Sequence, residues 1–484
     1  MTPLVSVPRS AFVQAEVRQS GLLIDARNYY RTLYHALESA QDFVLITGWQ
    51  FESGVKLLRG RDAESARHPV PLLEFLVALC NERPNLHVFI LAWDFSLVYA
   101  KDRESKQREK FTAGHERIRF EWDAHPSVGG SHHQKFVVVD GVVGFIGGID
   151  LCDARWDDCE HLPDDPQRVN VVGDPCKPYH DVQACFTGPI VPSLTAEFAE
   201  RWLRTTKEAL SWQVRAGCAL ANADLQELSH GSLQPIAASK AALSRTRVDE
   251  RAAPERVGEV LELLADAISA AERLLYVETQ YFTSRTVGQL LLKRMNDAAL
   301  PKLNIVVFMP HGADTAMEKM ALEDTQEGVL QAVLETARVM GHAVQLLYPA
   351  SHDSAGNEIA TFIHSKILIV DDRLLMVGSP NFTERSMALD TELAISWECS
   401  VDDDALCQSI RDIRCRLLAE HGGVSGEAFA SPETLCSTIE ALLERGDTRL
   451  RRREVGSPGP LGPVLAQLFD PGDGELIKAA LEAP

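Results

Sequence analysis

The chain has 484 residues, 45% of them hydrophobic and 24% charged, with a formal net charge of −21. Its length exceeds the usual size of a single hydrophobic core, so two domain-sized units are expected. The acidic balance excludes a broadly basic surface for nonspecific nucleic-acid binding and disfavours electrostatic docking on anionic membranes.

The N-terminal segment 1–21 lacks the apolar core of a signal peptide, and no stretch reaches the roughly 18 apolar residues of a membrane span. Ten cysteines are scattered without a C-x-x-C pair, which argues against a zinc ribbon and favours free thiols in a reducing compartment. We therefore expect a soluble, cytoplasmic protein, with secretion by a signal-free route left open as the alternative. We also expect a monomer whose contact with membranes is peripheral and transient.

Helical and strand-like patterns recur in the same order in both halves of the chain. A helical pattern precedes strand-like runs in the first half, at 43–47, 86–91 and 136–140. The second half has the equivalent runs at 274–278, 303–308 and 366–371. The first runs are offset by 274 − 43 = 231 residues, the closing aspartates of the last runs by 371 − 140 = 231, and the middle runs by 303 − 86 = 217. Matched blocks in one order indicate a duplicated domain.

The repeats predict the fold class and the domain boundaries. Helices alternating with continuously apolar strands are typical of α/β layers around a largely buried sheet. We predict a first repeat at 20–205, a linker at 206–244, a second repeat at 245–422 and a tail at 423–484, with a helix near 432–445.

Each repeat carries a His-x-Lys pair, His133 with Lys135 and His364 with Lys366. Residues two apart on a strand project from one face, so each pair would present its imidazole and ammonium together. A single histidine at a strand start is usually structural. Two matched copies in matched repeats favour chemistry, because packing alone does not require a buried lysine.

These residues resemble the phospholipase D superfamily, whose signature is H-x-K-x4-D followed by a Gly-Ser-x-Asn-like turn. The resemblance covers about 20–422, and the second copy, HSKILIVDDRLLMVGSPNFTERS, fits closely. In the first copy GGID (147–150) replaces the turn, but GGIDLCDARWD (147–157) looks like the first motif of the phospholipase D enzymes proper, as do ETQYFTS (278–284) and PYHDV (178–182). The resemblance implies two α/β sandwich repeats related by a pseudo-twofold axis, with one active site at their junction.

The residue types suit cleavage of a phosphodiester. A neutral imidazole can attack the anionic phosphate, and two lysines can bind its non-bridging oxygens. The second histidine can protonate the leaving alkoxide and later deprotonate the water or alcohol that releases the product. The resemblance implies His133 as the nucleophile that forms a phosphohistidine and His364 as the acid/base, although the residues alone do not order the two.

The resemblance also implies roles for residues near the two motifs. Asp181 and Glu392 would orient the histidines, with ordinary charged strand residues as the alternative. Phosphate binding would involve Gly148, Ser379 and Asn381. Asp150 stands where the turn has Asn, and it would repel the phosphate unless turned away or protonated. The motif carboxylates, Asp140 and Asp371, count with the catalytic set, but we expect them to brace the strand ends.

Four aromatic residues lie at repeat-equivalent strand ends, and they could line a substrate pocket or belong to the core: Trp49, Phe51, Tyr281 and Phe282. No cofactor or metal is required, because the lysines supply the positive charge. The acidic loop after the first motif could bind calcium, but a solvated loop is favoured without EF-hand spacing: Asp157, Asp158, Glu160, Asp164 and Asp165. The only compact basic cluster is expected to be a solvated helix end: Arg449, Arg451, Arg452 and Arg453.

The leading hypothesis is an enzyme that hydrolyses glycerophospholipids or transfers their phosphatidyl group to an alcohol. Its partners would be a phospholipid and an alcohol acceptor. A nuclease or another phosphodiesterase of the same superfamily is the alternative, which the acidic charge disfavours. Tyrosyl-DNA phosphodiesterases share the motif but lack its aspartate, present here as Asp140 and Asp371. A catalytically inactive scaffold is the third hypothesis, and both intact His-Lys pairs argue against it.

Overall fold

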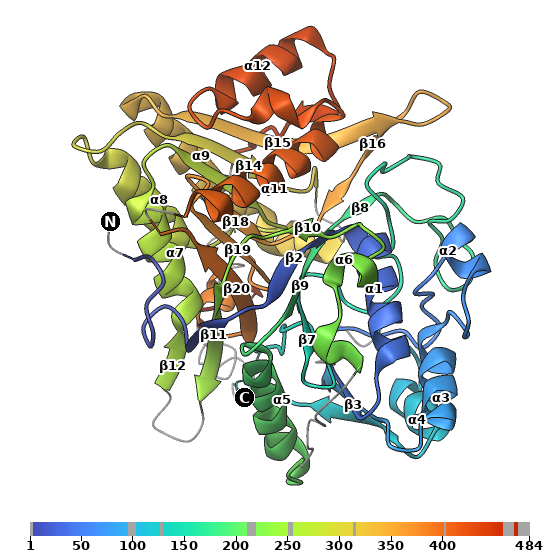
Figure 1. Cartoon of the computed structure of the whole chain (residues 1–484). Helices are drawn as coiled ribbons and strands as arrows, with labels where there is room; N and C mark the ends of the chain where they lie inside the picture. Colours follow the sequence, from blue (N-terminus) through green and yellow to red (C-terminus); the bar gives the residue numbers. More distant parts are fainter. Residues whose placement is uncertain are drawn as a thin grey trace, which may run out of the picture. The chain divides into compact units, whose positions relative to one another are not determined.

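The two sequence repeats fold as two units in the computed structural model (Figure 1). The structure describes residues 3–94, 103–125, 127, 129–210, 219–249, 255–312, 316–400, 403–457 and 469–472. The N-terminal unit comprises Gln14–His125 and Ser131–Ala241. The C-terminal unit comprises Met1–Val13, Pro126–Gly130 and Ala242–Pro484.

The N-terminal unit is built on one sheet with the strand order β10-β2-β9-β7-β6-β3-β4-β5. Its strands are β2 (Gln19–Ile24), β3 (Phe43–Gly48), β4 (His87–Trp93), β5 (Ile118–Asp123), β6 (Phe136–Val139), β7 (Val143–Gly147), β9 (Val182–Thr187) and β10 (Gln234–Pro235). Its helices are α1 (Asp25–Ser39), α2 (Gly60–Glu64), α3 (Leu72–Glu82), α4 (Gln107–Gly114), α5 (Val191–Thr206) and α6 (Leu225–Leu228). Two short strands, β1 (Val13–Glu16) and β8 (Tyr179–His180), lie outside this order.

The C-terminal unit repeats the arrangement with the strand order β11-β20-β19-β18-β13-β14-β15-β16. Its strands are β11 (Lys240–Asp249), β12 (Glu255–Gly258), β13 (Leu274–Glu278), β14 (Asn304–Phe308), β15 (Ala343–His352), β16 (Glu358–Ala360), β17 (Phe362–Ile363), β18 (Ile367–Val370), β19 (Leu374–Gly378), β20 (Glu392–Glu398) and β21 (Leu450–Arg452). Its helices are α7 (Glu259–Ala270), α8 (Arg285–Asn296), α9 (Ala316–Met340), α10 (Glu384–Ala388), α11 (Asp404–Gly422) and α12 (Leu435–Arg445).

Strand register confirms the duplication residue by residue. The parallel pairs begin at Phe43↔His87 in one unit and at Leu274↔Asn304 in the other, which reproduces the offsets of 231 and 217 (274 − 43 and 304 − 87). The antiparallel pairs of the motif strands also match, at Val44↔Val139 and Leu275↔Val370. The α/β fold class with two repeated domains is therefore confirmed.

Helices cover both faces of the N-terminal sheet. Phe89 and Phe136 contact α5 through the rings of Trp202 and Phe198, with centroids 5.2 and 6.5 Å apart. Their strand neighbours point the other way, into a core shared with α1 and α3. The motif strand β6 is therefore sealed on both sides, which explains its unbroken apolar run.

Apolar spacing determines the two equivalent helices α1 and α7. In α1 the buried side chains recur at helical intervals: Tyr29, Tyr30, Leu33, Tyr34 and Leu37. In α7 they are Val260, Leu263, Leu264, Ala267 and Ile268. Each helix therefore fixes the strand that follows it, β3 or β13, against the sheet.

The ends of the two units differ from simple sequence boundaries. The segment predicted as a linker, 206–244, contains α6, β10 and the start of β11, and β11 occupies the place of β2 in the second sheet. The N-terminal residues belong to the C-terminal unit, where Leu4 and Val5 are buried in its core and their backbone amides donate to the Glu398 carboxylate at 2.7 and 2.9 Å. The predicted tail helix is α12.

The arginine cluster of the tail is not a solvated helix end, and that expectation is corrected. Arg451 and Arg452 lie on β21, which pairs with β15. Arg451 contacts Glu358 at 2.7 Å, Arg453 contacts Glu327 at 2.8 Å, and Arg452 pairs with Glu440. Arg449 donates to the backbone carbonyl of Glu420. These arginines therefore make their contacts within the C-terminal unit.

Asp140 and Asp371 brace the ends of their motif strands, as expected. Asp140 accepts backbone N–H groups of Gln41, Asp42 and Phe43 at 2.8–2.9 Å. Asp371 accepts the equivalent groups of Glu272, Arg273 and Leu274 at 2.7–2.8 Å. Both have positive φ, 51° and 55°. Each carboxylate thereby ties its motif strand to the start of β3 or β13.

Within the described part of the chain, no helix is long and apolar enough to cross a membrane. The nine described cysteines are free thiols, and Cys218 lies outside the described residues.

We expect Asp140→Ala and Asp371→Ala each to lower the free energy of unfolding by about 3 kcal/mol, because each removes a carboxylate that accepts three backbone amides. Urea denaturation of each variant measures the change. Asp447→Ala is the matched control, since its side chain is 76% exposed. A loss as small as that of the control would contradict the bracing role.

Candidate active site

Both His-x-Lys segments lie directly before a motif strand rather than within it. The structure begins β6 at Phe136 and β18 at Ile367, one residue after each lysine, which corrects the prediction of a strand through the motif. The alternation of sides nevertheless extends back to the histidine. Lys135 and Lys366 each accept a backbone N–H on their carbonyl, from Gly147 and Gly378 at 3.3 Å. The segments are therefore held as extensions of the sheet.

The middle residue of the N-terminal motif anchors it to the helix side of the sheet. The Gln134 amide contacts Arg201 at 2.9 Å and Glu197 at 3.3 Å, both on α5. Arg201 also contacts Asp123 at 2.8 Å, at the end of β5. Because Gln134 faces α5, His133 and Lys135 project from the opposite side.

The C-terminal motif is anchored by a different set of residues at the same place. The Ser365 hydroxyl donates to the Glu278 carboxylate at the end of β13. Glu278 also accepts from the Tyr276 hydroxyl and lies 2.9 Å from Nε2 of His421 on α11. All four side chains are buried. Sequence reasoning missed Glu278 as a positioning residue, although it lies in the quoted ETQYFTS segment.

The lysine ammonium groups are buried and each contacts its own motif. Lys135 Nζ lies 3.2 Å from the His133 carbonyl oxygen and 3.3 Å from the Asp150 carboxylate. Lys366 Nζ donates to the His364 carbonyl. Each lysine is 2% exposed. Burial of both ammonium groups is costly unless they are paired, so their retention in the two units indicates a charged role.

Of the adjacent histidines 132 and 133, only His133 has the position of a reactive group. His132 is buried, with Nε2 3.4 Å from both Asp123 and the Ala124 carbonyl. Burial, followed by the Arg201 charge, holds the pKa of His132 well below its usual value. His132 is therefore a neutral core group, whereas His133 is partly exposed and His364 is 8% exposed.

Asp150 and Asn381 occupy equivalent positions, and the structure gives Asp150 a role that the sequence left open. Its carboxylate pairs with Lys135 and accepts the backbone N–H of Trp49 at 2.9 Å. Asp150 thus balances the lysine charge. The Asn381 side-chain oxygen is buried without a hydrogen-bond partner among the described residues. An acceptor without a partner at this position is suited to a ligand that donates a hydrogen bond.

Asp181 and Glu392 are also repeat-equivalent, although the sequence offset does not reveal it. Gly148 donates its backbone N–H to the Val182 carbonyl at 3.2 Å, and Ser379 donates to Leu393 at 3.0 Å. The offsets are 379 − 148 = 231 but 393 − 182 = 211, because the connection between turn and strand is 20 residues longer in the first repeat. Asp181 therefore stands directly before Val182 as Glu392 stands directly before Leu393, at equivalent places in the two sheets.

These contacts change what Gly148 and Ser379 can do. A Cβ on Gly148 would lie 2.2 Å from the Asp181 carboxylate, so only glycine fits there. In the second repeat Ser379 fills this place, and its hydroxyl donates to Glu392. The amides of both residues donate within the sheet, which corrects the prediction that they bind the phosphate. Gly148 instead leaves room for the Asp181 carboxylate, and Ser379 holds Glu392 through its hydroxyl.

The four predicted aromatics divide into two kinds. Phe51 and Phe282 are buried in the cores of their units, the alternative that the sequence left open. Trp49 is partly exposed and stacks on Trp93 with ring centroids 5.7 Å apart. Tyr281 is partly exposed and its hydroxyl accepts from Gln280 at 2.7 Å. Trp49 and Tyr281 remain candidates for substrate contact.

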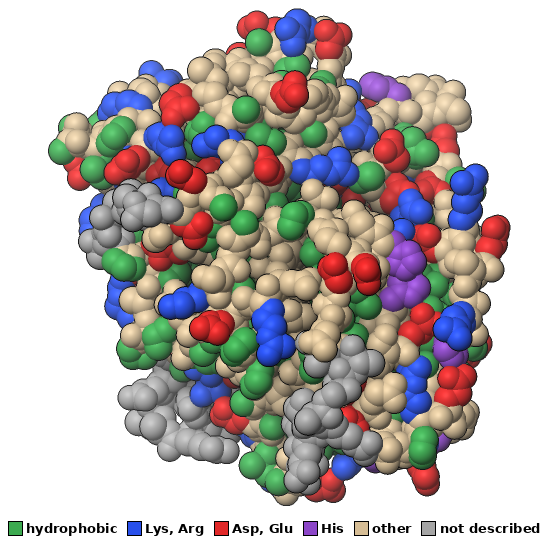
Figure 2. All heavy atoms as spheres, viewed as in Figure 1, with side chains coloured by type: hydrophobic (Ala, Val, Ile, Leu, Met, Phe, Trp, Pro, Cys, Tyr) green, Lys and Arg blue, Asp and Glu red, His purple; other side chains and the backbone are tan. Residues whose placement is uncertain are grey.

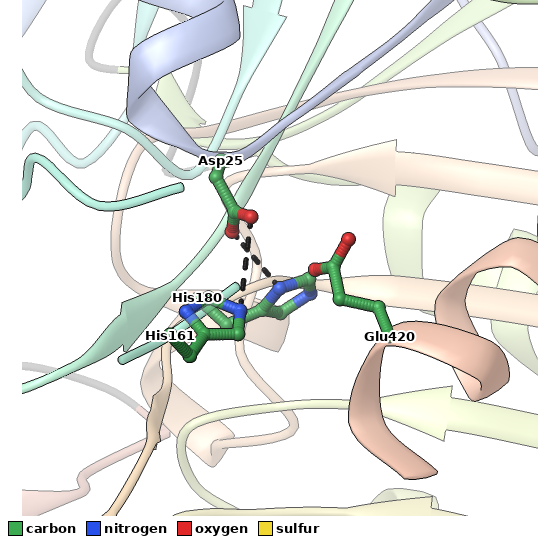
Figure 3. Close-up of side chains that lie close together, drawn as sticks. All are labelled: Asp25, His161, His180 and Glu420. Atoms are coloured by element: carbon green, nitrogen blue, oxygen red, sulfur yellow. Dashed lines mark ion pairs between the residues drawn. The ribbon is translucent and has the colours of Figure 1, made fainter. Parts of the chain in front are cut away.

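A buried histidine–carboxylate cluster near Asp181 was missed by sequence reasoning. His180 and His161 both point toward Asp25 (Figure 3), with N···O distances of 3.0 and 3.7 Å. His161 also contacts Asp157 at 2.9 Å, and Asp157 contacts Arg168 at 2.8 Å. Asp25 and His161 have positive φ, 64° and 45°, a strained conformation for such residues. The PYHDV segment contained the only signal, His180.

Asp25, His161 and His180 could bind a divalent cation. Their ligand atoms lie within 4.8 Å of one another, and imidazole with carboxylate suits transition metals such as zinc. Asp157 would then orient His161 from behind. Glu420, also drawn in Figure 3, belongs to the C-terminal unit. In the acidic loop, by contrast, the Asp157 carboxylate already contacts Arg168, His161 and the Tyr179 amide.

Comparisons with known proteins agree with this geometry. Residues 36–300 match the family model described as phospholipase D, and residues 264–412 match the model described as cardiolipin synthase, PLD-like domain. Phospholipase D alpha 1 of Zea mays is 23% identical over 542 aligned residues, which cover 85% of this chain and 66% of that protein. Phospholipase D A of Dictyostelium discoideum is 23% identical over 485 residues, covering 87% of this chain and 36% of that protein.

The fold also matches a solved structure. Phosphatidylserine synthase of Haemophilus influenzae Rd KW20 superposes with a TM-score of 0.55 at 13% identity, covering 90% of this chain and 95% of that one. This likeness is one of fold. The chain itself spans 66% or less of the length of the two curated relatives named above.

We expect Glu278→Gln to lower kcat for a chromogenic phosphodiester about tenfold, equivalent to about 1.4 kcal/mol in the barrier, because the amide cannot accept from Ser365, Tyr276 and His421 together. Stopped assays on folded protein measure kcat and KM. Glu440→Gln, on the surface of α12, is the control. An unchanged kcat would remove Glu278 from the positioning set.

Asp25→Asn should lower the free energy of unfolding by about 3 kcal/mol, because it breaks a buried contact with two histidines. Thermal melts of wild type and variant are compared in EDTA and in Zn²⁺ or Ca²⁺. A cation that binds the cluster raises the Tm of the wild type alone. A variant as stable as the wild type in EDTA would show that the cluster does not stabilise the unit.

Proposed function

The chain belongs to the phospholipase D superfamily, and we propose that it is a phosphodiesterase that hydrolyses glycerophospholipids or transfers their phosphatidyl group to an alcohol. The observation that carries the proposal is the pair of His-x-Lys segments, each extending a sheet in the same register with its lysine ammonium buried. One catalytic site would use both segments.

The proposed reaction begins with attack by a neutral imidazole. His133 bonds to phosphorus, the bond to the leaving alcohol oxygen breaks, and His364 gives that oxygen a proton. Lys135 and Lys366 stabilise the charge that develops on the non-bridging oxygens. Asp181, for which Gly148 leaves room, and Glu392, which Ser379 holds in position, would orient the two histidines.

Release of the product reverses the proton transfer. Water or an alcohol attacks phosphorus, His364 accepts its proton, and the bond between phosphorus and His133 breaks. Water gives a phosphatidic acid, and an alcohol gives a phosphatidyl-alcohol. Partition between the two follows from the covalent intermediate, because any alcohol that competes with water takes the phosphatidyl group.

Several observations favour a lipid substrate over a polyanion. Both matching family models describe lipid enzymes. On the face shown in Figure 2, acidic and basic side chains are interspersed rather than segregated into a basic groove, and the net charge is −21. Nucleic-acid binding relies on basic surface. The tail arginines are paired with glutamates, so they offer no free cluster either.

The test is mass spectrometry of products after incubation with mixed phospholipid vesicles and a short primary alcohol. We expect phosphatidic acid and the phosphatidyl-alcohol from the wild type, and a loss of more than a thousandfold in His133→Ala and in His364→Ala, because each removes a group that acts in every turnover. Protein quenched in an alkaline denaturant should carry an acid-labile phosphatidyl adduct on His133.

Matched controls are His87→Ala and His352→Ala, which alter exposed histidines of the two units. Circular dichroism confirms that all variants are folded. Substantial turnover in either motif variant would overturn the single-site mechanism. Cleavage of a phosphodiester reporter without any lipid turnover would retain the mechanism and replace the substrate class.

A further inference from the structure

The connection 151–178, which is longer in the first repeat than in the second, carries an apolar tip. Six large hydrophobic side chains are exposed among the described residues, and three of them lie in this connection: Leu162, Val171 and Val172. Val172 is 78% exposed, the highest value of the six. Scattered single exposures are ordinary, whereas two adjacent valines at a loop tip within one connection are not.

Hydrogen bonds make the tip a defined hairpin. The base is closed by Asn170 N–H to Asp174 oxygen at 2.8 Å and by Cys176 N–H to Arg168 oxygen at 2.9 Å. The Asn170 side chain accepts the amides of Val172 and Asp174 at 3.1 and 2.7 Å. Gly173 has φ of 96°, which the turn requires. The hydrogen-bonded turn therefore holds both valines in a defined, exposed position.

The hairpin is also fastened to the rest of the N-terminal unit. The Asp153 carboxylate accepts the Val171 amide at 3.0 Å, and Arg59, at the start of α2, donates to the Val169 carbonyl at 2.8 Å. Arg59 in turn stacks over Trp156 at 4.9 Å. In Figure 1 the connection lies beside α2. Because the hairpin is held rigidly to the N-terminal unit, binding of its apolar tip to a surface would hold the whole unit there.

The connection begins and ends at residues of the candidate site. It starts directly after Asp150, which pairs with Lys135, and it leads into Tyr179, His180 and Asp181. Its formal charge is −4, from seven acidic and three basic residues (7 − 3 = 4). An apolar tip on an acidic loop suits a surface without net negative charge.

We propose that this hairpin docks the protein on zwitterionic phospholipid bilayers by inserting Val172, with Val171 beside it, into the interfacial region. The proposal rests on the proposed function, because a substrate held in a bilayer needs a contact that brings the site to it. Insertion removes the aliphatic side chains from water, and the acidic residues behind the tip limit its depth.

The test compares Val172→Asp with Val339→Asp, an equivalent change at an exposed valine of α9. Binding to phosphatidylcholine vesicles is measured by sedimentation, and turnover is measured on vesicles and on a monomeric short-chain phosphatidylcholine. We expect Val172→Asp to weaken vesicle binding at least tenfold and to lower vesicle turnover in proportion, with monomer turnover unchanged. Val339→Asp should match the wild type, and Val172→Trp should bind vesicles more tightly.

Docking and catalysis can fail separately. Equal vesicle binding by Val172→Asp and the wild type, with monomer turnover intact, overturns the docking site and leaves the proposed function. Lost vesicle binding in Val172→Asp, with no phospholipid turnover by the wild type, keeps the docking site and overturns the function. Loss of concentration-dependent self-association in Val172→Asp, without any change in vesicle binding, would identify a contact between copies of the chain and overturn the proposal.

Discussion

Two buried lysine ammonium groups impose the main constraint on this structure. A cation removed from water must be held by oxygen atoms, or it destabilises the fold. Lys135 meets this requirement with the His133 carbonyl and the Asp150 carboxylate, and Lys366 donates to the His364 carbonyl. The two carbonyl contacts also fix the backbone of the histidine in the same motif. The same hydrogen bonds therefore pair the lysine cation and position the histidine of its motif.

The two repeats solve the same packing problem with different chemistry. Behind the first motif an amide, Gln134, is held by charged residues of α5. Behind the second motif a hydroxyl, Ser365, donates to the buried Glu278. The same divergence separates Gly148, whose missing side chain admits Asp181, from Ser379, whose hydroxyl reaches Glu392. Duplication preserved the backbone register while the side chains that secure it diverged, which allows the two halves to take different tasks.

Sequence patterns predicted the parts of the molecule that depend on local chain order. The offsets of 231 and 217 gave the duplicated α/β sheets, and the register of β3, β4 and β6 confirmed them. The bracing role of Asp140 also followed from its place at a strand end. Contacts between distant segments had no such signal. Glu278 reaches His421 across 143 residues, and Asp25 reaches His180 across a whole repeat, so neither cluster could be predicted.

Other predictions were wrong because the groups in question already have hydrogen-bond or ion-pair partners within the fold. Phosphate binding was predicted for Gly148, yet its backbone amide donates to the Val182 carbonyl. The tail arginines form a basic run in sequence, yet each has a partner in the fold. Whether a donor or a charge is free to bind a substrate depends on its partners, and these are known only from the tertiary structure.

The N-terminal residues complete the core of the C-terminal unit, and this determines the order of events during synthesis. Leu4 and Val5 leave the ribosome long before the Glu398 carboxylate that receives their amides, which lies 394 and 393 residues further along the chain. The C-terminal unit therefore cannot close its core while the chain is still short, and the leading segment has to wait until the trailing repeat has emerged. A gene cut between the repeats would separate that segment from its binding place, so the second half made alone should need residues 3–13 at its own start to close its core.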